Sequence, residues 1–257
     1  MRRRIPLLAW SMILLLLATA GCSNNHSEAN TIRIKQGQVH YQMGIDALRQ
    51  KNLPIAFREL MKAQAFQPNN ADITAAMALA WRYRGNLKKA NMLYLQALRI
   101  KPTPAMHNNY GRLLMQLKDF PGAEKSFRLA LDDPSYPRQD IAFISLGDAL
   151  MAQQHYDQAI DAYRQASLMN PKLSLATLRQ AKAFAISGRM PYAEALLLTA
   201  LRAQPGNRIF LEAVLPLLQE HHAKMNALAL IHSYAKSTNA DDQWVTRQKS
   251  QVAAWKP

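Results

Sequence analysis

Residues 140–173 read DIAFISLGDALMAQQHYDQAIDAYRQASLMNPKL. This 34-residue stretch has a small residue at its positions 8, 20 and 27, a tyrosine at position 24 and a proline at position 32. The same pattern recurs along the chain on nearly the same period. Six units can be aligned, and they begin near Gly37, Ala71, Pro104, Asp140, Ser174 and Arg208. Repetition at a fixed period of this length indicates a repeat architecture.

Five columns support the alignment. Position 20 is alanine in all six units: Ala56, Ala90, Ala123, Ala159, Ala193 and Ala227. Position 24 is large and apolar or aromatic: Leu60, Tyr94, Phe127, Tyr163, Leu197 and Ile231. Positions 8 and 27 are Gly or Ala in the first five units and fail in the sixth, at Leu215 and Tyr234. Prolines close four units at Pro68, Pro102, Pro171 and Pro205, and Pro134 stands one place early.

The columns match the tetratricopeptide pattern of a helix pair. Small side chains let neighbouring helices approach closely, and a large residue beside them fills the space. A proline at position 32 cannot extend the second helix of a pair. We therefore predict an all-α, right-handed superhelical solenoid of six tetratricopeptide repeats, stabilised by stacking. The alternative is an ordinary alanine-rich helical bundle, but five columns in phase make it improbable.

The predicted repeats cover residues 37–70, 71–103, 104–139, 140–173, 174–207 and 208–239. Two prolines in the insert 133–137 predict a loop between the third and fourth repeats. Residues 240–257 contain two tryptophans and two valines, and we interpret them as a C-terminal capping helix over the last repeat. The rival interpretation is a tryptophan-bearing membrane or partner motif.

The first 21 residues have the features of a secretory signal. Three arginines, Arg2 to Arg4, precede an apolar run from Ile5 to Ala20, which is too short for a typical membrane span. The stretch ATAGC, which ends at Cys22, resembles a bacterial lipobox, so we expect residues 1–21 to be a lipoprotein signal peptide and Cys22 to be acylated. Ser23 after the cysteine favours the outer membrane, and polar residues 22–36 are predicted to form a flexible tether on its periplasmic face.

Composition argues against several other classes. One cysteine excludes a disulfide framework, and the formal charge of +15 is dispersed, without the basic runs of a phosphate-binding groove. No nucleophile, metalloprotease or phosphate-loop motif occurs, so we predict no enzyme, cofactor, metal or small-molecule substrate. The pair His221-His222 is interpreted as a solvated face. The pairs Asp132-Asp133 and Asp241-Asp242 are interpreted as caps or turns.

Tetratricopeptide arrays present a concave surface from positions 2, 5, 9, 12 and 13 of their first helices. In the first three repeats the candidate groove residues are Tyr41, Ile45, Leu48, Leu79, Tyr83, Asn108, Arg112 and Met115. An exposed apolar strip of this kind indicates a binding site for an amphipathic helix or an extended peptide. Asn108 or Arg112 is expected to hold the peptide backbone or a carboxylate. The groove is expected to continue through Ile141, Ile144, Asp148, Met151, Leu175, Leu178 and Lys182. For any one apolar residue, packing within the array is an equally good explanation.

One stretch has a more specific resemblance. It comprises Asn108-Asn109-Tyr110-Gly111, then Phe120, Ala123, Phe127 and Ala130, then Tyr136-Pro137 and Leu146-Gly147. In these residues the chain resembles the type IV pilus biogenesis lipoproteins called PilF or PilW. The resemblance implies a pilotin, an outer-membrane lipoprotein that escorts secretin subunits and helps them assemble. The chain departs from the pattern at Ala47, where an aromatic residue is usual, and in the sixth repeat. The alternatives are an adaptor for tight-adherence secretion or for peptidoglycan enzymes, and a subunit whose catalysis resides on a bound partner.

Overall fold

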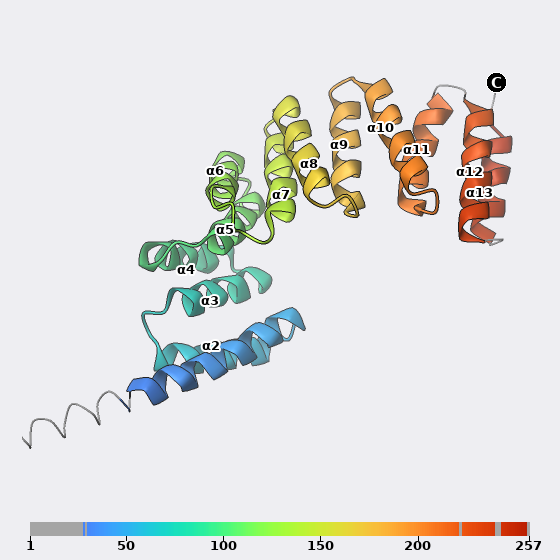
Figure 1. Ribbon diagram of the computed structural model, residues 1–257. Helices are drawn as coiled ribbons and strands as arrows, with labels where there is room; N and C mark the ends of the chain where they lie inside the picture. The colour runs from blue at the N-terminus through green and yellow to red at the C-terminus, as the bar shows by residue number, and fades with distance from the viewer. Residues whose placement is uncertain (1–27, 29, 221–222, 240–242, 256–257) are drawn as a thin grey trace, which may run out of the picture. The chain divides into compact units, whose positions relative to one another are not determined.

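The computed structural model describes residues 28, 30–220, 223–239 and 243–255, and the regular structure in these ranges is entirely helical (Figure 1). The first helix covers residues 30–49 without a gap, and residue 28 is also helical. It is followed by α2 (Leu53–Phe66), α3 (Ala71–Tyr83), α4 (Leu87–Ile100), α5 (Pro104–Gln116), α6 (Phe120–Leu131), α7 (Gln139–Ala152), α8 (Tyr156–Met169), α9 (Ser174–Ile186), α10 (Met190–Ala203), α11 (Arg208–Glu220), α12 (Lys224–Thr238) and α13 (Gln243–Ala253). The predicted all-α fold is confirmed. None of the helices in the described ranges is long and apolar enough to span a membrane.

The helices form hairpins with a recurring turn. Five turns place one residue in the left-handed region, at Lys51, Gly85, Lys118, Gln154 and Gly188. These residues share position 15 of the repeat. In each turn the following backbone N–H donates to a carbonyl five residues earlier, for example His155 N to Leu150 O at 2.9 Å. This is the helix C-cap known as the Schellman motif, which satisfies carbonyls that the ending helix leaves open.

The repeat columns form the core. The position-20 alanines and the position-24 side chains, from Leu60 to Ile231, are almost completely buried. A Cβ added to Gly111 would lie 2.7 Å from Cε1 of Phe127, and one added to Gly147 would lie 2.5 Å from Cε1 of Tyr163. Both contacts are closer than van der Waals packing allows. A small residue at position 8 therefore makes room for the large residue at position 24.

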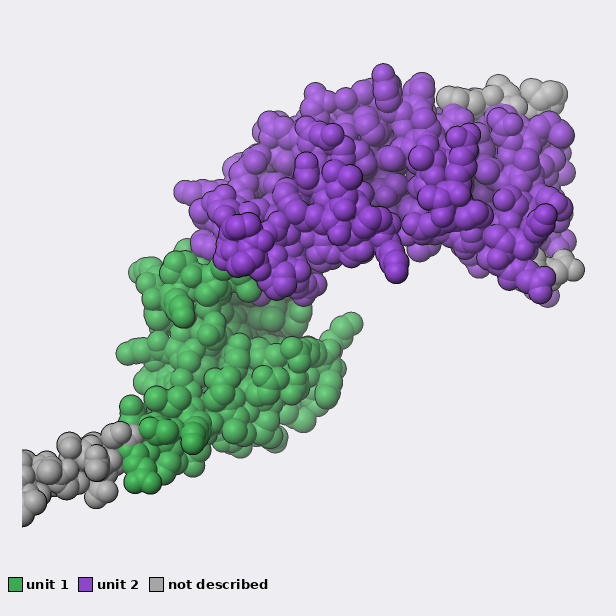
Figure 2. Space-filling view, viewed as in Figure 1, with its two compact units in different colours: residues 1–106 green, residues 107–257 purple. Residues whose placement is uncertain are grey.

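The chain divides into two compact units, residues 1–106 and 107–257 (Figure 2). In the first unit α2 packs against α3, and α3 packs against α4. In the second unit each helix from α6 to α13 packs against the next one along the chain. The boundary falls within α5.

The first helix starts earlier than the sequence predicts. Residues 30–36 belong to the predicted tether 22–36, but they continue the helix backwards by about two turns. Nε2 of Gln67, at the end of α2, donates to the carbonyl of Ile34 at 2.9 Å and supports this extension. Residues 30–36 also contain neither glycine nor proline. The predicted signal peptide and Cys22 lie outside the described residues.

The two irregular regions have clear local causes. Between α6 and α7 the chain turns at residues 132–138, where Oδ1 of Asp133 accepts from the backbone N–H of Ser135 at 2.9 Å. At the C-terminus α13 packs on α12, with Val245 and Val252 buried and Trp244 against Tyr234 at 5.4 Å between ring centroids. The pairs His221-His222 and Asp241-Asp242 lie outside the described residues.

Candidate partner-binding surface

The eight candidate groove residues divide between the two units. Five come from the first helix and α3 in the first unit, and three come from α5 in the second unit. They also differ in exposure. Leu48 and Asn108 are buried, Tyr83 and Arg112 are exposed, and the other four are half-buried.

In the first unit the candidate residues border the core. Leu48 is 4% exposed and belongs to the cluster of Ala47, Ala56, Leu60, Ala76, Met77 and Ala80. Tyr41, Ile45 and Leu79 pack against this cluster and are each partly open to solvent. Tyr83 at the end of α3 is 50% exposed, so it is the large candidate side chain of this unit that projects most. The accessible surface is therefore apolar, and the buried Leu48 packs beneath it.

Polar groups border this apolar surface. Burial raises the pKa of the Tyr41 hydroxyl, and the nearby carboxylate of Asp72 raises it further. The guanidinium of Arg82 lies 5.2 Å from the centroid of the Tyr83 ring. Arg82 is only 6% exposed, and its buried Nε has no hydrogen-bond acceptor among the described residues. A buried donor without an acceptor is costly, but Arg82 is too enclosed to offer this nitrogen to a partner.

The sequence analysis missed Arg82, although a signal was present. Arg82 stands at position 12 of the second repeat, which is one of the positions expected to face the groove. The candidate groove residues include the polar Asn108 and the charged Arg112, but not Arg82.

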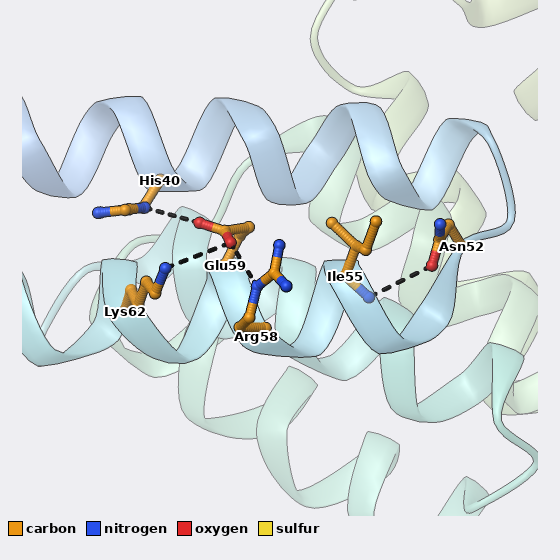
Figure 3. Close-up of polar contacts among 6 residues, drawn as sticks. All are labelled: His40, Asn52, Ile55, Arg58, Glu59 and Lys62. Carbon is orange, nitrogen blue, oxygen red and sulfur yellow. Dashed lines mark hydrogen bonds and ion pairs between the residues drawn. The ribbon is translucent and has the colours of Figure 1, made fainter.

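The buried carboxylate of Glu59 joins α2 to the first helix and is surrounded by more exposed basic side chains (Figure 3). The side chain of Glu59 on α2 is 2% exposed, and its carboxylate meets Nε of Arg58 at 2.7 Å, Nδ1 of His40 at 2.8 Å and Nζ of Lys62 at 3.4 Å. The hydrogen bond from Arg58, followed by that from His40, lowers the pKa of Glu59 to about 2. The ring of His40 also stacks on Phe66 with centroids 5.7 Å apart. The two contacts of His40 join α2 to the helix that carries Tyr41 and Ile45.

The second unit carries the remaining candidate residues on α5. Asn108 is buried, and its Oδ1 has no hydrogen-bond donor among the described residues. Arg112 is exposed, and Met115 packs against the core that contains Phe127 and Tyr163. Arg112 is therefore the candidate on α5 that is open to a partner.

The predicted continuation of the groove contains a polar network. The hydroxyl of Tyr163 donates to Oδ1 of Asp148 at 2.7 Å, and Nε of Arg179 lies 3.5 Å from the same oxygen. Burial and the Asp148 carboxylate both raise the pKa of Tyr163. Of the other predicted residues, Leu175 and Lys182 are exposed, Ile144 is buried, and Ile141, Met151 and Leu178 are half-buried. The network holds Asp148 in place between α8 and α9.

The described part of the chain contains no group of three or more His, Cys, Asp or Glu side chains that could hold a metal ion. A cavity of about 840 Å³ lies between α11 and α13 and is lined by Glu212, Leu215, Pro216, Gln219, Gln248, Gln251, Val252, Ala254 and Trp255. The lining mixes amides with apolar side chains. Surfaces of this kind suit contacts with another polypeptide.

Stacked helical hairpins with a partly exposed apolar surface define a repeat protein of the protein-binding class. A family model described as Tetratricopeptide repeat matches residues 75–139 and 144–208, which is half of the chain. The chain belongs to the tetratricopeptide repeat family, as predicted.

Two of the similar proteins are described as type IV pilus proteins. The chain is 26% identical over 165 residues to the type IV pilus assembly protein PilF of Pseudomonas aeruginosa, and the match covers 62% of this chain and 65% of that protein. The solved structure of P. aeruginosa PilF superposes with a TM-score of 0.67 at 20% identity, covering 87% of this chain and 99% of that one. PilW, described as a widely conserved type IV pilus biogenesis factor, gives a TM-score of 0.66 at 19% identity, with 85% and 98% covered.

A third structure concerns peptide binding. YrrB, described as a TPR protein with an unusual peptide-binding site, gives a TM-score of 0.55 at 17% identity, with 68% of this chain and 89% of that one covered. These structural likenesses show the fold. The sequence match adds a relationship to a type IV pilus assembly protein at low identity.

Proposed function

We propose that this protein is a non-catalytic assembly scaffold for type IV pili that acts as a pilotin for the outer-membrane secretin. The observation that carries the proposal is the sequence match to the type IV pilus assembly protein PilF, which is 26% identical over 165 residues. A scaffold needs a surface for another polypeptide, and the partly exposed apolar surface of the first unit supplies one.

In the proposed mechanism a secretin segment lies on the first unit. Its apolar side chains contact Tyr83 and the exposed parts of Tyr41, Ile45 and Leu79. Arg112 on the second unit is exposed and is a separate candidate for contact with an acidic group.

The location is part of the proposal. The lipobox at Cys22 supports acylation, and Ser23 supports transfer to the outer membrane. Two or three acyl chains hold a protein firmly to one leaflet, because each buried methylene contributes about 0.8 kcal/mol. The anchor would keep the scaffold on the periplasmic face, at high local concentration near its partner.

A substitution of Tyr83 tests the binding surface more specifically than a substitution of Ile45 or Leu79. Ile45 and Leu79 contact the core, so a glutamate there could unfold the unit, whereas Tyr83 is 50% exposed. Tyr83→Glu is expected to reduce secretin multimers about tenfold while helical content stays normal. Met92→Glu is the matched control, because Met92 is an exposed apolar residue on α4, and it should leave multimers unchanged. Normal levels of secretin multimers in the Tyr83→Glu strain would show that the apolar surface of the first unit does not bind the secretin segment.

Cys22→Ala tests the anchor separately. The variant is expected to leave the outer-membrane fraction on density-gradient separation of envelopes, because its acylation site is gone. Mass spectrometry of the peptide that begins at Cys22 in the wild-type protein should show the added acyl mass. Fractionation of Cys22→Ala with the outer membrane at the wild-type level would contradict lipid anchoring.

A further inference from the structure

The first helix carries an exposed apolar row. Val39 is 58% exposed, and Ile32 and Met43 are each about half exposed. Together with Gln36 these residues are spaced by four, three and four positions, so they lie along one face of the helix. The buried residues Gly44 and Leu48 lie on the other side. A surface helix normally presents polar residues to water, so three apolar side chains in one exposed row indicate a contact.

The repeat alignment identifies this row as a packing face. Val39 and Met43 stand at positions 3 and 7 of the first repeat. In the later repeats the equivalent pairs are buried or half-buried: Ile73 and Met77, Met106 and Tyr110, Ala142 and Leu146, Ala176 and Gln180, and Phe210 and Val214. In the described chain no hairpin lies before the first helix to cover the row. The same positions that pack in later repeats are therefore open in the first.

Charge indicates what covers the row. Residues 28–106 contain twelve Lys and Arg against four Asp and Glu, a formal charge of +8. Residues 107–257 contain seventeen against thirteen, a formal charge of +4. Arg33 and Lys35, which border the row, are exposed, and Asp46 beside it already accepts from Arg49 and Gln42. An apolar row between cations suits an anionic lipid surface.

The distance to Cys22 agrees with a lipid surface. The first helix is described without a gap from residue 30, which is eight positions after the cysteine. Eight extended residues reach at most about 28 Å, and the helix of residues 30–49 is itself about 30 Å long. Acyl chains on Cys22 would therefore keep the row within reach of the leaflet that holds them.

We propose that the first helix lies on the surface of an anionic phospholipid bilayer. Ile32, Val39 and Met43 enter the boundary between headgroups and acyl chains, and Arg33 and Lys35 contact lipid phosphates. The inference rests on the proposed acylation of Cys22. Tyr41 is two positions from Val39 and so points to the other side of the helix. The bilayer contact thus leaves the proposed partner-binding surface of the first unit open.

Depth measurements on the acylated full chain test the proposal. Val39→Cys and Met92→Cys are each labelled with an environment-sensitive fluorophore, since the single native cysteine is blocked by its lipid. The two native side chains are both 58% exposed and lie in the same unit, so Met92 is a matched control. The proteins are reconstituted in vesicles of about three parts phosphatidylethanolamine to one part phosphatidylglycerol, with nitroxide groups on the acyl chains.

The expected result is a blue shift of the fluorophore at residue 39 and quenching about threefold stronger than at residue 92. The double variant Arg33→Gln with Lys35→Gln, carrying the same label at residue 39, should lose part of this quenching. Equal quenching at residues 39 and 92 overturns the proposal. A blue shift at residue 39 that depends on protein concentration in lipid-free detergent indicates a second copy on the row, and one that needs added envelope proteins indicates a protein partner. Either result also overturns it.

The measurement separates this inference from the proposed function. The depth of residue 39 in the vesicle bilayer is measured without secretin. The measurement therefore still tests the bilayer contact if Tyr83→Glu leaves secretin multimers intact. The mass of the Cys22 peptide reports acylation in the same samples. If Cys22 is acylated and residue 39 is still not quenched, the anchor stands and the contact of the first helix fails.

Discussion

At the scale of single residues, two charged side chains show what the sequence pattern leaves out. Glu59 lies in an otherwise apolar helix face, and its partner His40 is nineteen residues earlier in the chain. Arg82 is buried beside Tyr83. Periodicity identifies where apolar and small side chains recur, but it says nothing about which charges the fold brings together. The alanine columns were predictable, and these two ionic environments required the structure.

The pKa of Glu59 leads to a prediction for acid stability. Because the folded state lowers this pKa from its ordinary value of 4.5 to about 2, the ionised carboxylate stabilises the fold at neutral pH. This stabilisation is complete above about pH 5 and is lost as pH falls through the range from about 4.5 to about 2. Denaturant titrations of the wild-type protein and Glu59→Gln should differ most at pH 7 and converge towards pH 2.

The control for this prediction is Asp46→Asn. Asp46 also takes part in an ion pair, with Arg49, but both side chains are well exposed. Its replacement should have little effect at any pH, because exposed pairs contribute little. A constant difference between wild type and Glu59→Gln from pH 7 to pH 2 would show that the carboxylate does not titrate as described.

At the scale of elements, the sequence predicted the helix pairs because each column has a steric reason. Small residues at position 8 meet large ones at position 24, as at Gly147 and Tyr163. The start of the first helix was wrong by the seven residues 30–36. Residues 30–36 lack the repeat pattern. Their helical conformation is supported by the side chain of Gln67, which donates to the carbonyl of Ile34, 33 residues earlier in the chain. A contact over that distance has no signature in the local sequence.

The hairpin turns allow a prediction about caps. After the turn, Asp119 caps α6 through Oδ1, which accepts from the backbone N–H of Gly122 at 3.0 Å, whereas His155 makes no such bond at the start of α8. Asp119→Ala is therefore expected to reduce the free energy of unfolding by about 1 kcal/mol, and His155→Ala by much less. Chemical denaturation of both variants measures the difference. Equal losses would mean that the cap bond contributes nothing.

At the scale of the whole molecule, the chain is an array of local contacts in two units. In the second unit each helix contacts mainly its neighbours along the chain, and α13 covers the last hairpin through Val245 and Val252. The family and the all-α fold were predictable because every repeat packs on its neighbour through the same residue positions. The binding surface was predictable only as a set of positions. Which of them are open, such as Tyr83, and which are buried, such as Leu48, depends on packing that the columns do not encode.

Because each helix contacts mainly its neighbours, a destabilising substitution in one hairpin should leave distant hairpins unaffected. Val252→Asp places a charge at a buried position of α13, so amide hydrogen exchange should speed up in α12 and α13 and stay unchanged in α7 and α8. Gln251→Asp, at the exposed neighbouring position, is the control and should alter neither region. Faster exchange throughout the second unit in Val252→Asp would show that this unit unfolds as one cooperative body.

The left-handed residue at position 15 has a practical consequence. The hairpin turn requires a positive φ angle at this position and no particular side chain, and lysine, glycine and glutamine all adopt it. All five of these residues are exposed. These turns are therefore regularly spaced sites for labelling. Dyes or spin labels at Lys118 and Gln154 would give the distance between equivalent positions of successive repeats in the second unit.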